Sequence, residues 1–209
     1  MSEAKTIQTM RLDGGIACLN FVNTKDNRSK ETGIDYLSQY RDLLDLCERL
    51  GLMPAKTRQV LERLAKAYPD QARQEFDKAI ALRELLYRVF SQLIEKGKPP
   101  ELELQQLSTQ VANALSYLEL FFDKTTREMK LIYTRPALEQ PSWLMLQSVA
   151  ELLTGKELAL LKKCPSCYWL FLDRSKNKSR KWCSMATCGD VSKVKQAYHR
   201  KKKERKKPS

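Results

Sequence analysis

Four cysteines near the C-terminal end of the sequence have the spacing of metal ligands. They are Cys164, Cys167, Cys183 and Cys188. The two residues between Cys164 and Cys167 allow a tight turn that aims both thiolates at one ion, and tetrahedral zinc accepts four such ligands at about 2.3 Å. The spacing therefore predicts one structural zinc ion. The second pair is separated by four residues, so iron–sulfur ligation or a redox role of the CxxC pair stays open as an alternative.

Other residue types that could do chemistry are sparse. Cys18 and Cys47 stand alone among apolar neighbours, so we expect both to be reduced and buried. The one histidine, His199, lies in a basic segment and is interpreted as solvated or phosphate-contacting, because four cysteines already saturate zinc. The rest of the chain has no Gly-rich phosphate loop and no carboxylates paired at an obvious spacing. Nothing therefore argues for an enzyme, and we expect none.

The net charge of +13 lies entirely in the C-terminal quarter. Residues 1–161 carry 22 Lys and Arg against 22 Asp and Glu, whereas residues 162–209 carry 16 basic and three acidic residues. This asymmetry indicates a polyanionic partner, although a solvated basic tail would give the same pattern. DNA is the expected partner and RNA the alternative, since zinc modules with basic tails bind both. The residues expected to meet phosphates are Lys176, Lys178, Arg180, Lys181, Lys193, Lys195 and Arg200.

The segments around the cysteines must position the ligands. Tyr168–Leu172 is strand-like, Asp173–Ser179 is a polar turn, and Arg180–Trp182 leads into the third ligand, which predicts a β-hairpin between the two pairs. Apolar residues at helical spacing follow Gly189 among lysines and arginines, so a basic helix should leave the site. Together these features predict a treble-clef-like or ribbon-like zinc finger with four cysteine ligands and a basic helix.

The preceding segments are predicted to be mainly helical. Apolar residues recur every three or four positions in five segments: Asp35–Leu50, Thr57–Tyr68, Gln71–Lys96, Glu101–Ser116 and Ser142–Leu153. In the fourth of these, the spacing predicts burial of Leu104, Leu107, Val111 and Leu115. Between the last two, Tyr117–Tyr133 changes to alternation and predicts a small β-hairpin. The predicted fold class is therefore mainly α, with one small hairpin and a C-terminal zinc finger.

These elements divide the chain into three predicted parts. Residues 1–155 form a helical domain, residues 156–200 form the finger, and residues 201–209 form a basic tail. We expect a chain ending near Gly155 to fold without zinc, because its helices carry regular apolar faces. Within the helical domain, Asn20, Asn23 and Thr24 either line a ligand pocket or make local turn and capping hydrogen bonds.

The cysteine segment also resembles a known family. The residues that carry the resemblance are Cys164-Pro-Ser-Cys167, Trp169, Phe171-Leu172-Asp173, Ser175, Asn177, Arg180, Trp182-Cys183-Ser184-Met185 and Cys188-Gly189. This pattern, over about Leu161–Arg200, resembles the CGNR zinc finger family. The stretch Leu19–Thr24 resembles the start of the ABATE-type helical domain that usually precedes such fingers. The resemblance implies a bacterial transcription regulator, with DNA binding by the finger. For the body it implies sensing of a small-molecule effector or formation of a homodimer.

The sequence departs from the family pattern in two places. Gly189-Asp190-Val191 stands where the family has Gly-Asn-Arg, and Asn20 stands where it has Asp. The contact that the family's arginine makes is therefore missing, and lysine does not reproduce a bidentate arginine contact. Lys193 and Lys195 are the nearby residues that could supply the charge.

The sequence also gives an expectation about location. Met1–Gly15 has no apolar run, and no later stretch approaches the roughly 20 apolar residues of a membrane span. We therefore expect a cytoplasmic protein, associated with the nucleoid through DNA and not with a membrane. The alternative from another class is an enzymatic or small-molecule-binding body whose basic tail only localises it.

Overall fold

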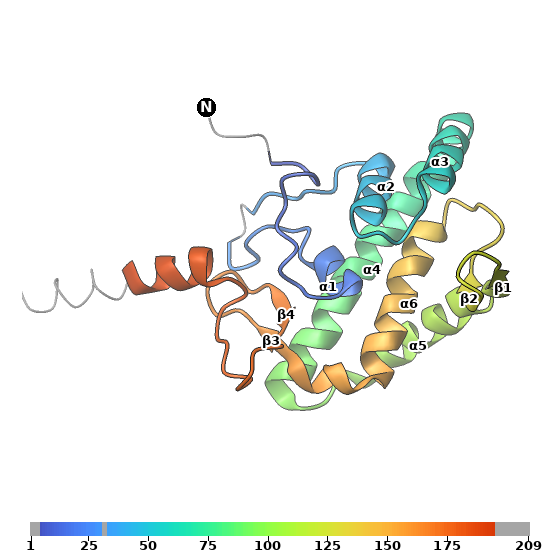
Figure 1. The fold of residues 1–209 in the computed structure, drawn as a ribbon. Helices are drawn as coiled ribbons and strands as arrows, with labels where there is room; N and C mark the ends of the chain where they lie inside the picture. Colours follow the sequence, from blue (N-terminus) through green and yellow to red (C-terminus); the bar gives the residue numbers. More distant parts are fainter. Residues whose placement is uncertain (1–4, 31–32, 195–209) are drawn as a thin grey trace, which may run out of the picture.

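The computed structural model describes residues 5–30 and 33–194. In this part of the chain six α-helices and two antiparallel hairpins are arranged as Figure 1 shows. The elements are α1 (Ala17–Val22), α2 (Tyr40–Arg49), α3 (Ala55–Ala67), α4 (Pro69–Lys96), α5 (Glu101–Leu115), β1 (Glu119–Asp123), β2 (Glu128–Ile132), α6 (Gln140–Thr154), β3 (Leu161–Lys163) and β4 (Leu170–Leu172). The fold is thus mainly α, as predicted, and its second hairpin includes a strand, β3, that the sequence did not predict.

The long helix α4 is the centre of the helical body. Its buried face includes Leu82, Leu86, Val89 and Phe90, which repeat at the three- and four-residue spacing of one helix face. The short helix α1 lies against both α4 and α6, and Phe21 on it is completely buried. Burying side chains of this size stabilises the fold by about 1.5–3 kcal/mol each. These helices form the predicted apolar core.

Helix α2 begins at Tyr40, so the predicted start at Asp35 was wrong. The Asp35 carboxylate accepts hydrogen bonds from Leu37 N at 3.0 Å and from two guanidinium nitrogens of Arg83 at 2.6 Å each. These bonds hold the chain in a turn, and the helix then starts at a capping box formed by Gln39 and Asp42. A contact 48 residues away in sequence therefore overrides the local helical pattern.

The predicted buried face of α5 is only partly right. Leu107 is buried, but Leu104 is 37% exposed, and Ala114 takes a core position instead. The reason is that α5 packs against α4 and α6 along one edge and leaves its first turns open to solvent. The spacing of apolar residues thus predicts the helix correctly, but it predicts more buried residues than the helix has.

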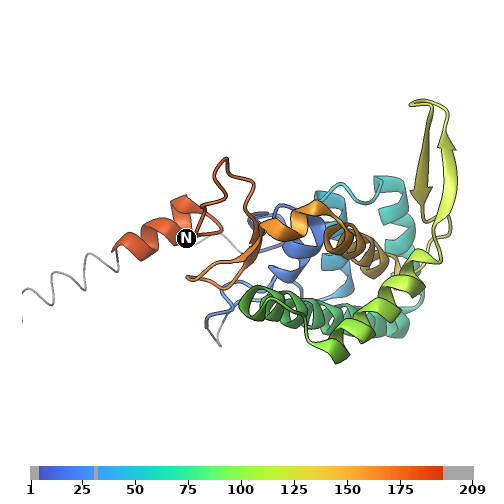
Figure 2. The ribbon, with the colours of Figure 1, turned by 90° about the horizontal axis from the view of Figure 1, so that it is seen from below.

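The predicted hairpin between α5 and α6 is confirmed. Strands β1 and β2 pair with Leu120 opposite Leu131 and Phe122 opposite Met129. These four side chains share one face and are all exposed; Leu120 is 72% exposed. Figure 2 shows the hairpin standing out from the helices. At its base Tyr117 stacks on Trp143 with ring centroids 4.4 Å apart.

The second hairpin, β3–β4, corrects the predicted hairpin between Tyr168–Leu172 and Arg180–Trp182. Strand β4 pairs instead with β3, which precedes the first cysteine, so that Leu161 lies opposite Leu172. The segment between Cys164 and Cys167 is therefore itself part of the hairpin turn. Leu161 and Leu172 belong to the core of the helical body.

Among the described residues, no helix is both long enough and apolar enough to cross a lipid bilayer.

Candidate metal centre

The four predicted ligands converge on one point. Their sulfur atoms all lie within 4.8 Å of one another, and the Sγ atom of Cys183 is 3.5 Å from that of Cys167 and 3.7 Å from that of Cys188. Four sulfurs bound at about 2.3 Å to one zinc ion would lie about 3.8 Å apart at the corners of a tetrahedron. A disulfide would need about 2.05 Å, and all four thiols are free. The cysteines fit a single structural zinc site.

Two different elements present these ligands. Cys164 and Cys167 lie in the β3–β4 turn, where the Tyr168 amide donates to the Cys164 carbonyl oxygen at 2.9 Å. Cys183 and Cys188 lie just before and within a short helical turn, Met185–Gly189, which continues as helix through residues 190–194. A hairpin turn combined with the start of a helix is the treble-clef-like arrangement. A ribbon-like site would place the second pair on another hairpin.

The four clustered cysteine thiols lie so close together that each affects the pKa of its neighbours. Hydrogen bonds from Cys167 and Cys183 lower the pKa of the Cys164 thiol, and the shared proton raises the pKa of Cys167. Several thiolates in one buried place repel each other, and a divalent cation removes that repulsion. Cys18 and Cys47 differ because each is isolated in the core, where burial raises the pKa of the thiol to about 12. Both are reduced and buried, as predicted.

A buried carboxylate organises the loop between the two cysteine pairs. Asp173 is completely buried. It accepts hydrogen bonds from Lys162 Nζ at 2.6 Å, from the Ser175 hydroxyl at 2.6 Å and from the Arg180 amide at 2.8 Å. Burial alone would raise the pKa of this carboxyl, but the bonds from Lys162, Ser175 and Arg180 lower it below its usual range. Asp173 therefore stays charged and fixes both ends of the loop.

Sequence reasoning missed the role of this carboxylate and of Lys162. The only available signal was the Asp173-x-Ser175 pattern within the family resemblance, which named the residues without a role. Lys162 gave no signal, because one lysine in a basic segment resembles its neighbours. Its ammonium group also donates to the Lys178 carbonyl oxygen at 2.5 Å, so it ties strand β3 to the loop.

The finger is attached to the helical body through the N-terminal part of the chain. The Asn23 side chain forms two hydrogen bonds with the backbone of Leu170. Trp169 is 1% exposed, and its indole Nε1 donates to the Lys25 carbonyl oxygen at 2.9 Å. The guanidinium group of Arg11 lies over the Trp169 ring, 5.0 Å from its centroid. Residues separated by well over 100 positions thus hold the finger against the body, as Figure 1 shows for β4 and α1.

The predicted pocket residues Asn20, Asn23 and Thr24 are used in hydrogen bonds inside the protein. Asn20 Oδ1 accepts from the Gly14 amide at 2.9 Å, and the Thr24 hydroxyl donates to the Phe21 carbonyl oxygen at 2.7 Å. All three residues are buried. These contacts favour the alternative of turn and capping hydrogen bonds over a ligand pocket.

The predicted phosphate-binding residues differ in their exposure and in the contacts that they make within the protein. Lys176, Lys178 and Lys181 are exposed on the loop that Asp173 organises. Arg180 in the same loop is half-buried, because its Nε donates to the Trp182 carbonyl oxygen at 2.8 Å and its guanidinium group lies 4.9 Å from the Phe171 ring centroid. The structure therefore leaves three lysines of this loop exposed and uses Arg180 internally.

The helical segment after Cys188 carries the remaining candidates. Lys193 is exposed and lies 3.8 Å from the Asp190 carboxylate. Lys195 and Arg200, with His199 and the predicted tail, lie outside the described residues.

Two family models match this chain, one over the helical body and one over the finger. Residues 161–201 match the CGNR zinc finger. Residues 15–156, more than half of the chain, match the ABATE family, described as "Putative stress-induced transcription regulator". The chain belongs to the ABATE family and carries a CGNR zinc finger, which confirms the resemblance. Neither description is that of an enzyme class. No curated protein matches the chain.

Proposed function

We propose that the protein is a DNA-binding transcription regulator whose finger holds a basic surface against the phosphate backbone. The observation that carries the proposal is the loop with Lys176, Lys178 and Lys181. Its three lysines are exposed. Its backbone is fixed at one side by the hydrogen bond from the Arg180 amide to Asp173, and it ends at the metal ligand Cys183. A preorganised set of charges gains more from phosphate contacts than a freely moving one, because less conformational freedom is lost on binding.

The position of the finger supports this proposal. The finger and the helical segment 190–194 lie at one end of the molecule, and the hairpin β1–β2 lies at the other end (Figures 1 and 2). A duplex could therefore approach the finger without meeting the helical body. The body is left free for the sensing or dimerising role that we propose for it, and DNA binding would place the protein at the nucleoid.

Selection of bound sequences from random duplex DNA by the full, zinc-loaded chain tests this function. We expect the bound sequences to be enriched in one motif, because a regulator recognises a particular DNA sequence. In a parallel binding assay, changing Lys176, Lys178 and Lys181 together to Ala should weaken binding strongly. The matched control changes the exposed body residues Lys56, Lys98 and Lys124 to Ala, which removes the same charge.

RNA is the second candidate, because exposed lysines attract either polyanion. Competition between duplex DNA and structured RNA at equal salt distinguishes the two. Stronger binding of RNA than of DNA would contradict the proposal of a DNA-binding protein. A loss of affinity in the control triple variant equal to that in the loop variant would show that the loop lysines do not contact the nucleic acid.

A further inference from the structure

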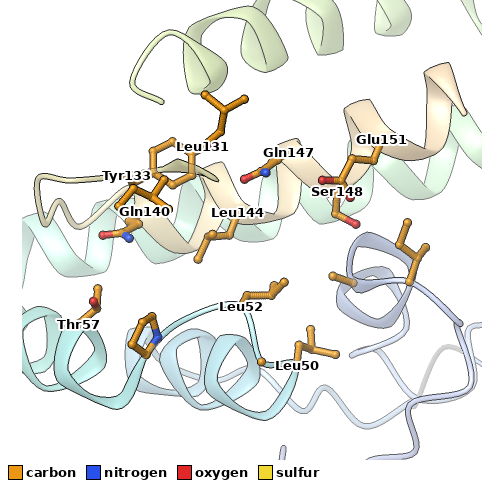
Figure 3. Close-up of a pocket in the computed structure, with 15 residues that line it drawn as sticks. Leu50, Leu52, Thr57, Leu131, Tyr133, Gln140, Leu144, Gln147, Ser148 and Glu151 are labelled. Carbon is orange, nitrogen blue, oxygen red and sulfur yellow. The ribbon is translucent and has the colours of Figure 1, made fainter. Parts of the chain in front are cut away.

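The helical body contains a cleft of about 550 Å³ that is separate from the zinc site. Helix α6 forms one side of it, and Leu50 and Leu52, from the segment that joins α2 to α3, lie opposite (Figure 3). The α6 residues that line it follow the spacing of one helix face: Gln140, Leu144, Gln147, Ser148 and Glu151. The α6 side of the cleft is thus mostly polar, with Leu144 between the polar residues, whereas Leu50 and Leu52 on the opposite side are apolar. The volume of the cleft suits a small organic molecule.

A buried amide at one end of the cleft lacks a partner. Gln140 is only 5% exposed, and its Oε1 atom has no hydrogen-bond partner among the described residues. A buried carbonyl oxygen without a donor destabilises a fold, and native proteins pair nearly all such atoms. Because Gln140 lines the cleft next to Tyr133, a bound molecule with an N–H or O–H group could supply the missing donor.

The charge of the cleft selects the class of ligand. Among the 15 residues described as lining it, Glu151 is the one charged residue, although the chain as a whole carries +13. Glu151 forms no ion pair with another described residue. A cation is therefore favoured in the cleft, and a carboxylate or phosphate would be repelled. Gln140 and Glu151 are eleven residues apart on α6, which corresponds to about 16 Å along the helix axis.

We infer that this cleft binds an elongated organic amine. The protonated amine lies beside Glu151, the apolar middle of the molecule lies over Leu50, Leu52 and Leu144, and a hydroxyl or amide N–H at the far end donates to Gln140 Oε1. The inference does not depend on DNA binding, and its test measures ligand binding alone.

The test is calorimetric titration of the full, zinc-loaded chain with three probes of equal chain length: aminodecanol, decylamine and hydroxydecanoate. We expect one aminodecanol per chain, weaker binding of decylamine, which lacks the far donor, and no binding of hydroxydecanoate, which is an anion. Binding of hydroxydecanoate as tight as that of aminodecanol would overturn the inference, and so would the absence of aminodecanol binding.

Two substitutions locate the ligand. Glu151→Gln should weaken both amines about tenfold, because it removes the charge at an exposed position without disturbing the fold. Gln140→Leu should reduce aminodecanol affinity to that of decylamine and should raise the melting temperature of the ligand-free protein, because it removes the unpaired oxygen. The matched control, Glu119→Gln on the exposed hairpin, should change neither affinity. Unchanged aminodecanol affinity in both Glu151→Gln and Gln140→Leu would refute the site.

Discussion

The side-chain amide of Asn23 forms two hydrogen bonds with the backbone of Leu170. The Nδ2 atom donates to the Leu170 carbonyl oxygen at 2.8 Å, and the Oδ1 atom accepts from the Leu170 amide at 3.0 Å. The side chain therefore satisfies the free edge of β4 in the way that a neighbouring strand would. Asn23 is completely buried at the C-terminal end of α1, so this pair joins the N-terminal helix to the strand that follows the first two zinc ligands.

Replacing Asn23 should destabilise the whole protein. Asn23→Ala leaves the Leu170 N–H and C=O groups buried without partners, and each unsatisfied group costs about 1–3 kcal/mol. We expect a loss of at least about 2 kcal/mol in the free energy of unfolding, measured by urea denaturation. Asn113→Ala, at an exposed position on α5, is the control and should change little. Equal effects of the two substitutions would contradict the role given to Asn23.

The zinc site gives a second prediction. Elemental analysis of the purified protein should find one zinc per chain, and Cys183→Ser should abolish retention of the metal. Metal binding supplies about 10–16 kcal/mol of apparent free energy in small zinc modules, so the finger should lose its order when zinc is removed. Iron with visible charge-transfer absorption would instead support the iron–sulfur alternative. The matched control is Cys47→Ser in the body, which should retain the metal.

Truncation at Gly155 should destabilise the helical body, contrary to what the helical periodicity alone predicts. The core of the body includes Leu161, Leu170 and Leu172 from the second hairpin. Removing them exposes apolar surface on α4 and leaves Asn23 without its partner. We expect the shortened chain to unfold at lower urea concentration than the zinc-loaded full chain, as followed by circular dichroism. Identical midpoints would show that the body is independent of the finger.

Local pattern and long-range contact explain which features could be predicted from sequence. Five of the six helices and the four cysteines were predictable because helical period and ligand spacing are local properties. Helix α1 was not predicted, because its six residues are too few to show a helical period. Strand β3 was missed because it has three residues, two of them lysines, and pairs across the metal-binding turn. The start of α2 depends on Arg83, and the attachment of the finger depends on Asn23 and Leu170, which are 147 residues apart. Such contacts have no periodic signature.

The buried carboxylate gives a pH-dependent prediction. Its hydrogen bonds lower the pKa of Asp173 in the folded state, so it stabilises the finger above the unfolded value of about 3.9, and this contribution is lost as pH falls through the lower, folded value. At neutral pH Asp173→Asn should release zinc to a chelator faster than the unmodified protein. The difference in unfolding free energy between the two proteins should shrink as pH falls below about 4.

The control for this substitution is Asp190→Asn, whose side chain is exposed. It changes the charge equally without removing a buried acceptor. A release rate for Asp173→Asn that matches the Asp190→Asn rate would show that overall charge, and not the organisation of the loop, governs retention of the metal.

The proposed interface predicts a steep dependence of DNA affinity on salt. Each phosphate contact contributes about 0.9 to the slope of log affinity against log salt concentration. Changing Lys176, Lys178 and Lys181 together to Ala should therefore lower the magnitude of the slope by about 3, whereas the triple change of Lys56, Lys98 and Lys124 should leave it unaltered. Fluorescence anisotropy with a labelled duplex measures both. An unchanged slope in the first variant would exclude the loop lysines from the interface.

The apolar face of the β1–β2 hairpin has a consequence for handling the protein in solution. Leu120, Phe122, Met129 and Leu131 are exposed together, next to strand edges that could pair with another chain. Salt screens the repulsion between molecules of net charge +13, and strongly hydrated anions such as sulfate promote apolar association. Solubility should therefore be highest in buffers of low sulfate content, and precipitation should begin through the hairpin. Met129→Lys should extend the soluble range without affecting the metal site at the opposite end.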